Sequence, residues 1–284
     1  DALANGPSGY KTESFSMFRH SAWSVGYDTQ QVIISGSGNT PLYYRDRIES
    51  AIDNVTRVTY GNVFCEEYRK QLKSAINVND DLTQTFASAS LQTSFTVTGS
   101  QHRHYVANQF KQVARLIAAR ESRNVERDLF YVHQGGFDGH SSVVSSLRSL
   151  LTNVDQAINA FVTELKAQGV FDKVTLVMHS DFGRTLSPNS NAGTDHGWAG
   201  HTFVLGGSVD GGKIHNRYPE TLLPGHAMDV MHGRIIPEFP WESVMVPIAQ
   251  WMGMEPDQTA GVFPNLGNFN ASTHILPRST VFAN

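Results

Sequence analysis

Apolar residues recur three or four positions apart in two segments of the chain, neither of which contains glycine or proline. Such periodicity is typical of helices that bury one face. The shorter segment has its apolar positions at Val106, Phe110, Val113 and Leu116 or Ile117. The longer one stops at Gly169, and its positions are Val144, Leu147, Leu151, Val154, Ile158, Val162 and Leu165. The pattern predicts two amphipathic helices in the second half of the chain.

Short β-branched and aromatic runs flank the longer helix. Residues 129–132 and 174–178 fit buried strands, and residues 202–205 fit a third. A strand, a helical crossover of this length and another strand form a βαβ unit, in which the two strands are parallel and their carboxyl ends share one sheet edge. A further helix is expected over residues 241–252. We therefore predict an α/β fold with a mostly parallel, doubly wound sheet flanked by helices.

The first hundred residues give weaker patterns. Glycine, serine, asparagine and threonine interrupt short apolar runs at 31–34 and 55–60, and one helix is expected from Arg45 to about Ile76. Turn-forming residues at 5–9 and 35–41 predict surface loops. We expect residues 1–284 to form a single domain in which residues 1–100 are irregular.

Composition excludes some classes of partner. A net charge of -4, a pI near 6.3 and the lack of a basic tract argue against nucleic acid. No apolar run approaches the roughly 20 residues that span a bilayer. The lone Cys65 permits no intramolecular disulfide and is expected to be a small buried apolar side chain. The start at Asp1, without a signal peptide, suggests a processed or trimmed chain.

Two tripeptides satisfy the acceptor rule for N-linked glycans, at Asn54 and Asn270. Together with the lysine-poor, Ser/Thr/Asn-rich surface, they favour a secreted, extracellular or cell-surface glycoprotein. The alternative is that both are ordinary loop asparagines.

Carboxylates, imidazoles and one guanidinium gather in three glycine-containing segments where the predicted strands end or begin. The first segment carries Asp138 and His140, the second Asp181 and Arg184, and the third Asp195, His196 and His201. Aspartate oxygen and histidine nitrogen are standard zinc donors. Because unpaired charges are costly to bury, a cation explains the convergence of these segments best. We therefore expect a divalent-metal site, with zinc first and calcium or magnesium as alternatives.

Simpler interpretations remain open for each segment taken singly. Asp138 with His140 could be an Asx turn beside a histidine, and Asp181 could pair with Arg184 instead of binding a metal. The other histidines are expected to be structural, and Trp198, Trp241 and Trp251 to belong to the core or a pocket wall.

Four motifs carry a resemblance to a known family: GGFDGH at 135–140, SDFGRTLSPN at 180–189, TDHGWAGHTFVLGGSVDGG at 194–212 and VFPNLGNF at 262–269. In these the chain resembles the secreted family called domain of unknown function 1501 (DUF1501), which is placed in the alkaline phosphatase and sulfatase-like superfamily. The resemblance covers residues 85–270 and implies a doubly wound α/β fold with one or two divalent metals that activate a nucleophile.

Carried over residue by residue, the resemblance implies that Asp138, His140 and His196 bind one metal and Asp181 a second. It also implies that His201 is a further ligand and that Arg184 clamps an anionic oxygen. Relatives begin with a strand that ends in a Gly-Gly-Asn-Asp-Gly-like turn, and nothing before Asp138 matches it. Either a separate N-terminal fragment completes the site, or the protein lacks this strand and keeps a single-metal or degraded site.

Two functions are consistent with these features. One is a secreted metal-dependent hydrolase that acts on small phosphate or sulfate esters, with Arg184 as a catalytic residue that holds the anionic oxygens. The other is a non-catalytic extracellular structural or binding protein, self-associating as a homo-oligomer or binding glycans, that keeps the fold with an incomplete site.

Overall fold

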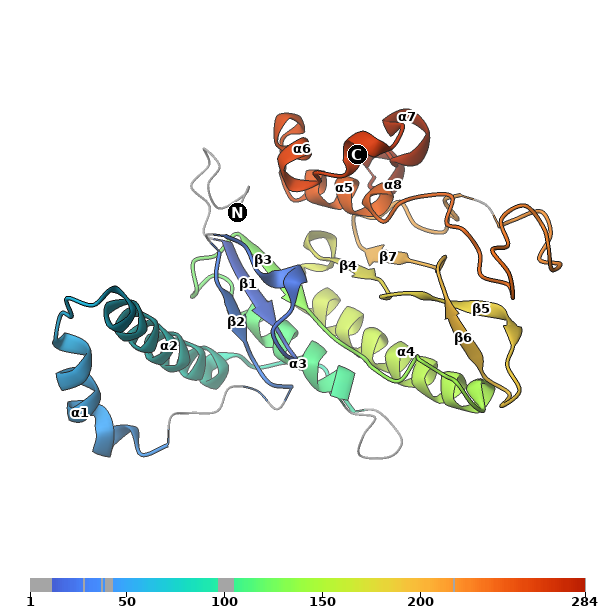
Figure 1. The fold of residues 1–284 in the computed structure, drawn as a ribbon. Helices are drawn as coiled ribbons and strands as arrows, with labels where there is room; N and C mark the ends of the chain where they lie inside the picture. Colours follow the sequence, from blue (N-terminus) through green and yellow to red (C-terminus); the bar gives the residue numbers. More distant parts are fainter. Residues whose placement is uncertain are drawn as a thin grey trace.

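The computed structural model describes residues 12–27, 29–36, 38, 43–96, 105–216 and 218–283. Its strands are β1 (Thr12–Ser16), β2 (Gln31–Ile33), β3 (Arg127–Tyr131), β4 (Thr175–Met178), β5 (Gly183–Pro188), β6 (Thr194–Gly197) and β7 (Phe203–Gly206). Its α-helices, shown with the strands in Figure 1, are α1 (Arg45–Arg57), α2 (Val63–Ser88), α3 (Tyr105–Ala118), α4 (Val143–Ala167), α5 (Glu242–Trp251), α6 (Thr259–Val262), α7 (Ala271–His274) and α8 (Arg278–Val281).

The described strands form one small parallel sheet and two antiparallel pairs. In the parallel sheet β1 lies between β2 and β3, and Phe15 of β1 is in register with Phe130 of β3. Their rings stack with centroids 5.6 Å apart. The pairs are β4 with β7 and β5 with β6. The fold class is therefore mixed α/β, with β1 as a central strand that the interrupted N-terminal pattern did not reveal.

Most expected elements of the second half are present. The helices predicted from periodicity are α3 and α4, and the helix expected over 241–252 is α5. The predicted strands are β3, β4 and β7. The prediction that the two strands of the βαβ unit share one sheet is wrong, however: β3 bonds to β1 in the parallel sheet, and β4 bonds to the antiparallel β7 in a separate pair. Periodicity reports which residues are extended, whereas strand partners are chosen by contacts distant in sequence.

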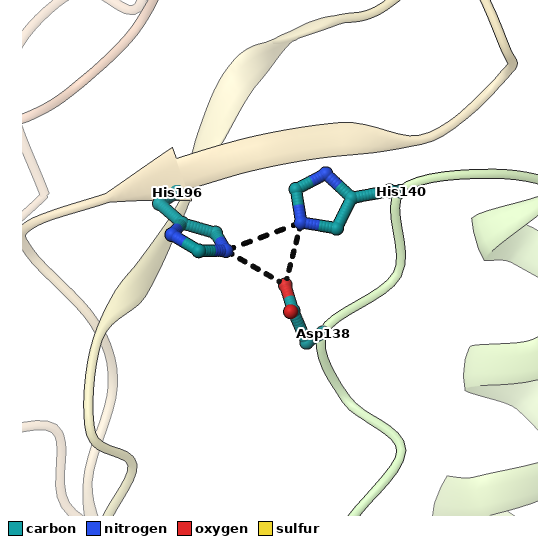
Figure 2. Close-up of side chains that lie close together, drawn as sticks. All are labelled: Asp138, His140 and His196. Atoms are coloured by element: carbon teal, nitrogen blue, oxygen red, sulfur yellow. Dashed lines mark hydrogen bonds and ion pairs between the residues drawn. The ribbon is translucent and has the colours of Figure 1, made fainter.

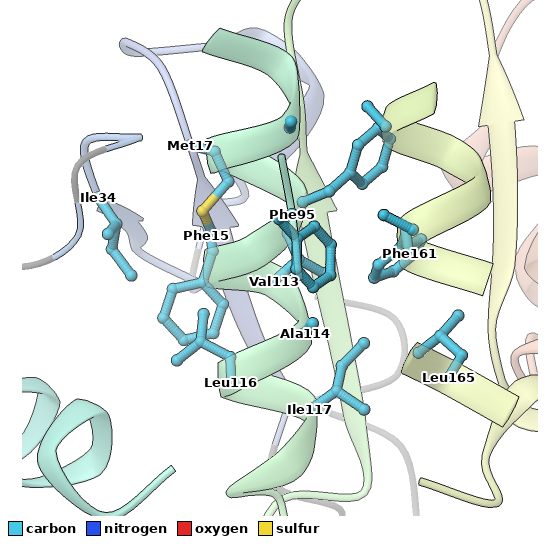
Figure 3. Close-up of a cluster of buried hydrophobic side chains, with 14 of the residues drawn as sticks. Phe15, Met17, Ile34, Phe95, Val113, Ala114, Leu116, Ile117, Phe161 and Leu165 are labelled. Carbon is cyan, nitrogen blue, oxygen red and sulfur yellow. The ribbon is translucent and has the colours of Figure 1, made fainter. Parts of the chain in front are cut away.

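The main core lies between the parallel sheet and helices α2, α3 and α4. Phe15 and Met17 of the β1 segment pack with α3 residues such as Leu116 and with Phe161 and Leu165 of α4 (Figure 3). This explains the periodicity of α3 and of the second half of α4, where Leu165 is buried and Ile158 packs against the cluster. The first apolar positions of the predicted α4 stripe, Val144, Leu147 and Leu151, are exposed instead. Across the part of the chain that the structure describes, no helix has the length and apolar character needed to cross a membrane.

Two expectations about the N-terminal half are wrong. The single helix from Arg45 to Ile76 is broken after Arg57, and α2 starts again at Val63. Asn62 caps α2, because its side-chain oxygen accepts hydrogen bonds from the backbone of Phe64 and Cys65 at 2.9 and 3.2 Å. Cys65 therefore sits in the first turn of α2, and its side chain is exposed rather than buried.

The turns expected in this half are only partly described. Ser35 and Gly38 form a bridge closed by a hydrogen bond from Gly38 N to Ser35 O of 2.8 Å, as the turn prediction for this segment requires. Residues 5–9 lie outside the described residues.

A buried ion cluster holds β1 and β3 together. Glu13 and Asp128 are register partners, so two carboxylates face each other across the strands. Arg123 donates to both oxygens of Asp128 at 2.9 Å and also to Glu13. Its guanidinium lies 5.0 Å from the centroid of the Phe15 ring, and its side chain is 7% exposed. The arginine thus neutralises two carboxylates that would otherwise repel each other.

Replacing Arg123 by alanine should lower the free energy of unfolding by about 3–5 kcal/mol, because it leaves the buried Asp128 and the partly buried Glu13 without their guanidinium. The measurement is urea denaturation followed by circular dichroism. As a control, Arg120→Ala removes a guanidinium whose partner Glu121 is exposed, and should cost less than about 1 kcal/mol. Equal losses in the two variants would contradict the assigned role of the cluster.

Candidate metal centre

Three side chains direct their ligand atoms at one another, as Figure 2 shows. Asp138 Oδ1 lies 3.0 Å from His140 Nε2 and 3.1 Å from His196 Nε2, and the two nitrogens are 3.1 Å apart. The side chains are 51, 49 and 58% exposed, respectively. We call these residues the triad. Its ligand atoms form a nearly equilateral triangle that is open to solvent.

The triad joins two parts of the chain. Asp138 and His140 lie in the segment between β3 and α4, and His196 lies on β6, opposite Arg184 of β5. The segment begins at a fixed point, because the buried Gln109 of α3 donates to His133 O and accepts from His133 N at 2.8 and 2.9 Å. The side-chain amide of Gln109 thus pairs with the backbone of His133 as a neighbouring strand would, and it fixes the chain just beyond the end of β3.

Backbone hydrogen bonds join the loop between β5 and β6 to the start of α4. Ser142 N donates to Asn191 O at 3.2 Å, and Val143 N donates to Ala192 O at 3.0 Å. In the other direction, Thr194 N donates to Gly139 O at 3.1 Å. The loop therefore satisfies N–H groups that the first turn of a helix leaves unpaired, and it fixes β6 beside His140.

Gly193 permits this close contact. A Cβ atom at residue 193 would lie 2.2 Å from the carbonyl carbon of His140, well inside van der Waals distance. Only a residue without a side chain lets the two backbones approach so closely. Gly193 is thus required for the backbone segments that carry His140 and His196 to pack this closely.

Arg184 orients the triad from β5. Its Nη1 donates to Asp138 Oδ1, its Nη2 donates to the backbone oxygens of Gly139 and Thr194, and its Nε donates to Thr194 Oγ1 at 2.9 Å. All three nitrogens are therefore bonded to the protein. In this arrangement Arg184 positions Asp138, which differs from the anion clamp that the resemblance implies and from the alternative pairing with Asp181.

Asp195 and Asn189 hold His140 of the triad in place. Asp195 Oδ1 lies 3.4 Å from His140 Nδ1 and accepts from Asn189 Nδ2 at 3.2 Å. The same amide donates to His140 O at 3.0 Å. A carboxylate on Nδ1 favours the tautomer whose Nε2 lone pair is free to bind a metal, an arrangement common in zinc sites. Sequence reasoning missed Asn189, although an Asx residue at the start of a glycine-containing loop was a usable signal.

Hydrogen bonds and charges keep both carboxylates ionised. Partial desolvation of Asp138 favours its neutral form, but the hydrogen bond from Arg184 and the charges of His140, His196 and Arg184 outweigh it and lower the pKa of Asp138 below 3.8. The hydrogen bond from Asn189, followed by the interaction with His140, likewise lowers the pKa of Asp195.

The donor set fits a zinc ion. Zinc binds mixed sets of imidazole nitrogens and carboxylate oxygens such as this one, whereas calcium and magnesium favour oxygen ligands alone. Ligands at zinc distances in a tetrahedron lie about 3.4 Å apart, close to the 3.0–3.1 Å of the triad. With three protein ligands and solvent on one side, the site resembles open catalytic zinc sites more than closed structural ones.

The other predicted site residues lie outside this group. Among the described residues, the cluster of candidate ligands contains neither Asp181 nor His201. Asp181 is exposed in the turn between β4 and β5. His201 Nε2 instead forms a hydrogen bond with the hydroxyl of Tyr218, and their rings stack at 5.2 Å. The structure thus assembles one triad from the first and third predicted segments, and the second segment contributes Arg184, which bonds to Asp138.

Two further residues border the triad. The Phe182 ring lies 4.3 Å from the His196 ring, and Arg234 Nε donates to His196 O at 3.1 Å. Arg234 also contributes to the lowered pKa of Asp195. Sequence reasoning missed Arg234, because it follows β6 by many residues and only the tertiary structure returns it to this strand.

Fold and site together define a mixed α/β protein with a candidate metal centre at the end of a parallel strand. A family model described as "Protein of unknown function (DUF1501)" matches residues 48–228, more than half of the chain. The chain therefore belongs to the DUF1501 family. No curated protein and no solved structure gives a significant match.

Replacing Arg184 by methionine in metal-free protein should raise the pKa of Asp138 towards 3.8, because its main stabilising hydrogen bond is lost. A depressed folded-state pKa stabilises the fold above the unfolded value and loses this effect as the pH falls. The stability gap between wild type and variant should therefore shrink below pH 3.8. Carboxyl carbon NMR and denaturation at several pH values measure both effects. Arg148→Met, on an exposed position of α4, should leave the pKa of Asp138 unchanged.

Proposed function

We propose that this protein is a metal-dependent hydrolase of small phosphate or sulfate esters that uses one divalent cation, preferably zinc. The triad carries the proposal: a carboxylate and two imidazoles converge within about 3 Å of one another and leave a face open to solvent. A bound zinc would act as a Lewis acid and lower the pKa of water at that face.

The chain's own residues would prepare the site for this chemistry. Arg184 holds Asp138 as a carboxylate, and Asp195 holds His140 with Nε2 directed at the centre. Phe182 covers one side of His196 and limits access of water from that direction. These supports reduce the rearrangement needed when metal and substrate bind.

The charges favour an anionic substrate. Arg184 and Arg234 both contact the segments that carry the triad, through Asp138 and through the backbone of His196. With a divalent cation they would give this edge of the fold a positive potential, which attracts anions. A phosphate or sulfate ester fits the site better than a neutral ester or amide.

The proposal includes a place in the alkaline phosphatase and sulfatase-like superfamily, with a doubly wound sheet. The parallel sheet supports it, since the segment with Asp138 and His140 follows the carboxyl end of β3, where ligands bind in open α/β folds.

A second candidate is a non-catalytic extracellular binding protein that keeps a reduced site. It is favoured by the placement of His201 on Tyr218 and by the engagement of every Arg184 nitrogen with the protein. The two candidates differ in turnover, whereas both allow metal binding.

Wild-type protein should bind close to one zinc per chain by elemental analysis, and Asp138→Ala should lose the metal and any hydrolysis of an aryl phosphate or aryl sulfate. The matched control is Asp181→Ala, an aspartate outside the triad, which should keep the metal. Asp195→Asn should weaken zinc affinity by ~10–100-fold, because it perturbs the group on Nδ1 of His140. Metal binding without turnover of either ester would favour the non-catalytic candidate, and absence of metal would reject the hydrolase.

We also propose that the protein is secreted and carries N-linked glycans. Asn270 and Asn54 are both exposed. Asn270 caps α7 at its N-terminus, whereas Asn54 lies inside α1. Thr56, the hydroxyl residue of the Asn54 tripeptide, is buried and donates to Ile52 O at 2.8 Å. Glycosylation enzymes act on accessible acceptor segments, so Asn270 is the better substrate of the two.

Expression in a eukaryotic secretory system should therefore give a band that shifts after treatment with an N-glycosidase. Asn270→Gln should remove most of this shift, and Asn54→Gln should have the smaller effect. A chain that shows no shift at all would contradict the glycan proposal.

A further inference from the structure

Helices α1 and α2 form a hairpin that carries many exposed apolar side chains. In Figure 1 it projects from the side of the molecule opposite to β5 and β6. We call its exposed apolar surface the hairpin face, and its large residues, with exposures from 36 to 82%, are Val55, Val58, Tyr60, Val63, Phe64 and Tyr68. A concentration of this kind within fourteen residues is unusual for a monomer surface and is typical of an interface.

The hairpin face has a hollow beside its protruding rings. The hollow has a volume of about 370 Å³, and Val55, Tyr60, Phe64, Tyr68 and Leu72 are among its lining residues. Phe64 is 82% exposed and Tyr68 72%, so both rings stand at the border of the hollow they line. A face that presents a ring and a hollow side by side can pack against a copy of itself through a two-fold axis.

The ring and the hollow lie along one stripe of α2. Phe64, Tyr68 and Leu72 are four residues apart, so they share one side of the helix, and all three line the hollow. If two α2 helices pack antiparallel around Tyr68, Phe64 of each chain faces Leu72 of the other and therefore lies over the hollow of the other copy.

The available apolar area suits such a dimer. The six side chains present on the order of 600 Å² of exposed surface per chain, since an aromatic side chain contributes about 150–250 Å² when fully exposed. With the polar rim, this approaches the roughly 800 Å² per partner of a standard protein interface. A second copy of the chain is therefore a sufficient occupant.

We propose that the hairpin face is a homodimer interface in which α2 packs antiparallel on α2 of a second copy. Phe64 and Tyr68 are its anchors, and Leu72 lines the hollow over which Phe64 of the second copy lies. The triad remains accessible, because the hairpin and the β5–β6 pair lie at opposite sides of the molecule (Figure 1).

Sedimentation equilibrium of the whole chain tests the interface. Wild-type protein should be dimeric at micromolar concentration, and Phe64→Glu should weaken the dimer at least ~10-fold, because a charge replaces an anchor ring. The matched control is Ile214→Glu, which changes a side chain that is 92% exposed and lies outside the hairpin face, and it should leave the dimer intact. Circular dichroism and zinc content should be unchanged in both variants, which separates this proposal from the metal site.

A monomeric wild-type chain or a dimer insensitive to Phe64→Glu would overturn the proposal.

Discussion

The contact between the loop joining β5 to β6 and the start of α4 is the constraint on which the candidate metal centre depends. Two backbones approach so closely at Gly193 and His140 that a side chain at residue 193 could not be accommodated. The hydrogen bonds of Ser142, Val143 and Thr194 across this contact fix the distance between the two parts of the chain. The triad can converge because backbone hydrogen bonds hold together the two segments that carry its residues.

At two places in the fold an arginine offsets the negative charge of neighbouring carboxylates. Arg123 lies between Glu13 and Asp128, where parallel strands bring two carboxylates together. Arg184 binds Asp138 beside two imidazoles and also holds the surrounding backbone. The first cluster is buried and contributes to stability, whereas the second is half exposed and prepares a site. The two clusters contain the same type of ion pair, so the difference between a structural role for Arg123 and a role at the candidate site for Arg184 follows from their different burial.

The packed core and the two exposed surface features, the triad and the hairpin face, lie in different parts of the molecule. The main core joins the parallel sheet to α2, α3 and α4, and Gln109 extends this order to the segment that bears Asp138 and His140. The triad and the hairpin face lie outside this core, at the surface. A site supported by a packed frame can stay open to solvent without losing its geometry.

The sequence by itself determined the amphipathic helices α3, α4 and α5, the strands β3, β4 and β7, and the segments that supply Asp138, His140 and His196, because periodicity and local composition are properties of neighbouring residues. Only the tertiary structure decided the strand partners, the central place of β1, the break between α1 and α2, and the exposure of Cys65. It also decided that Arg184 holds Asp138 and that His201 pairs with Tyr218. These outcomes depend on contacts between residues far apart in the chain, whose energies no local pattern records.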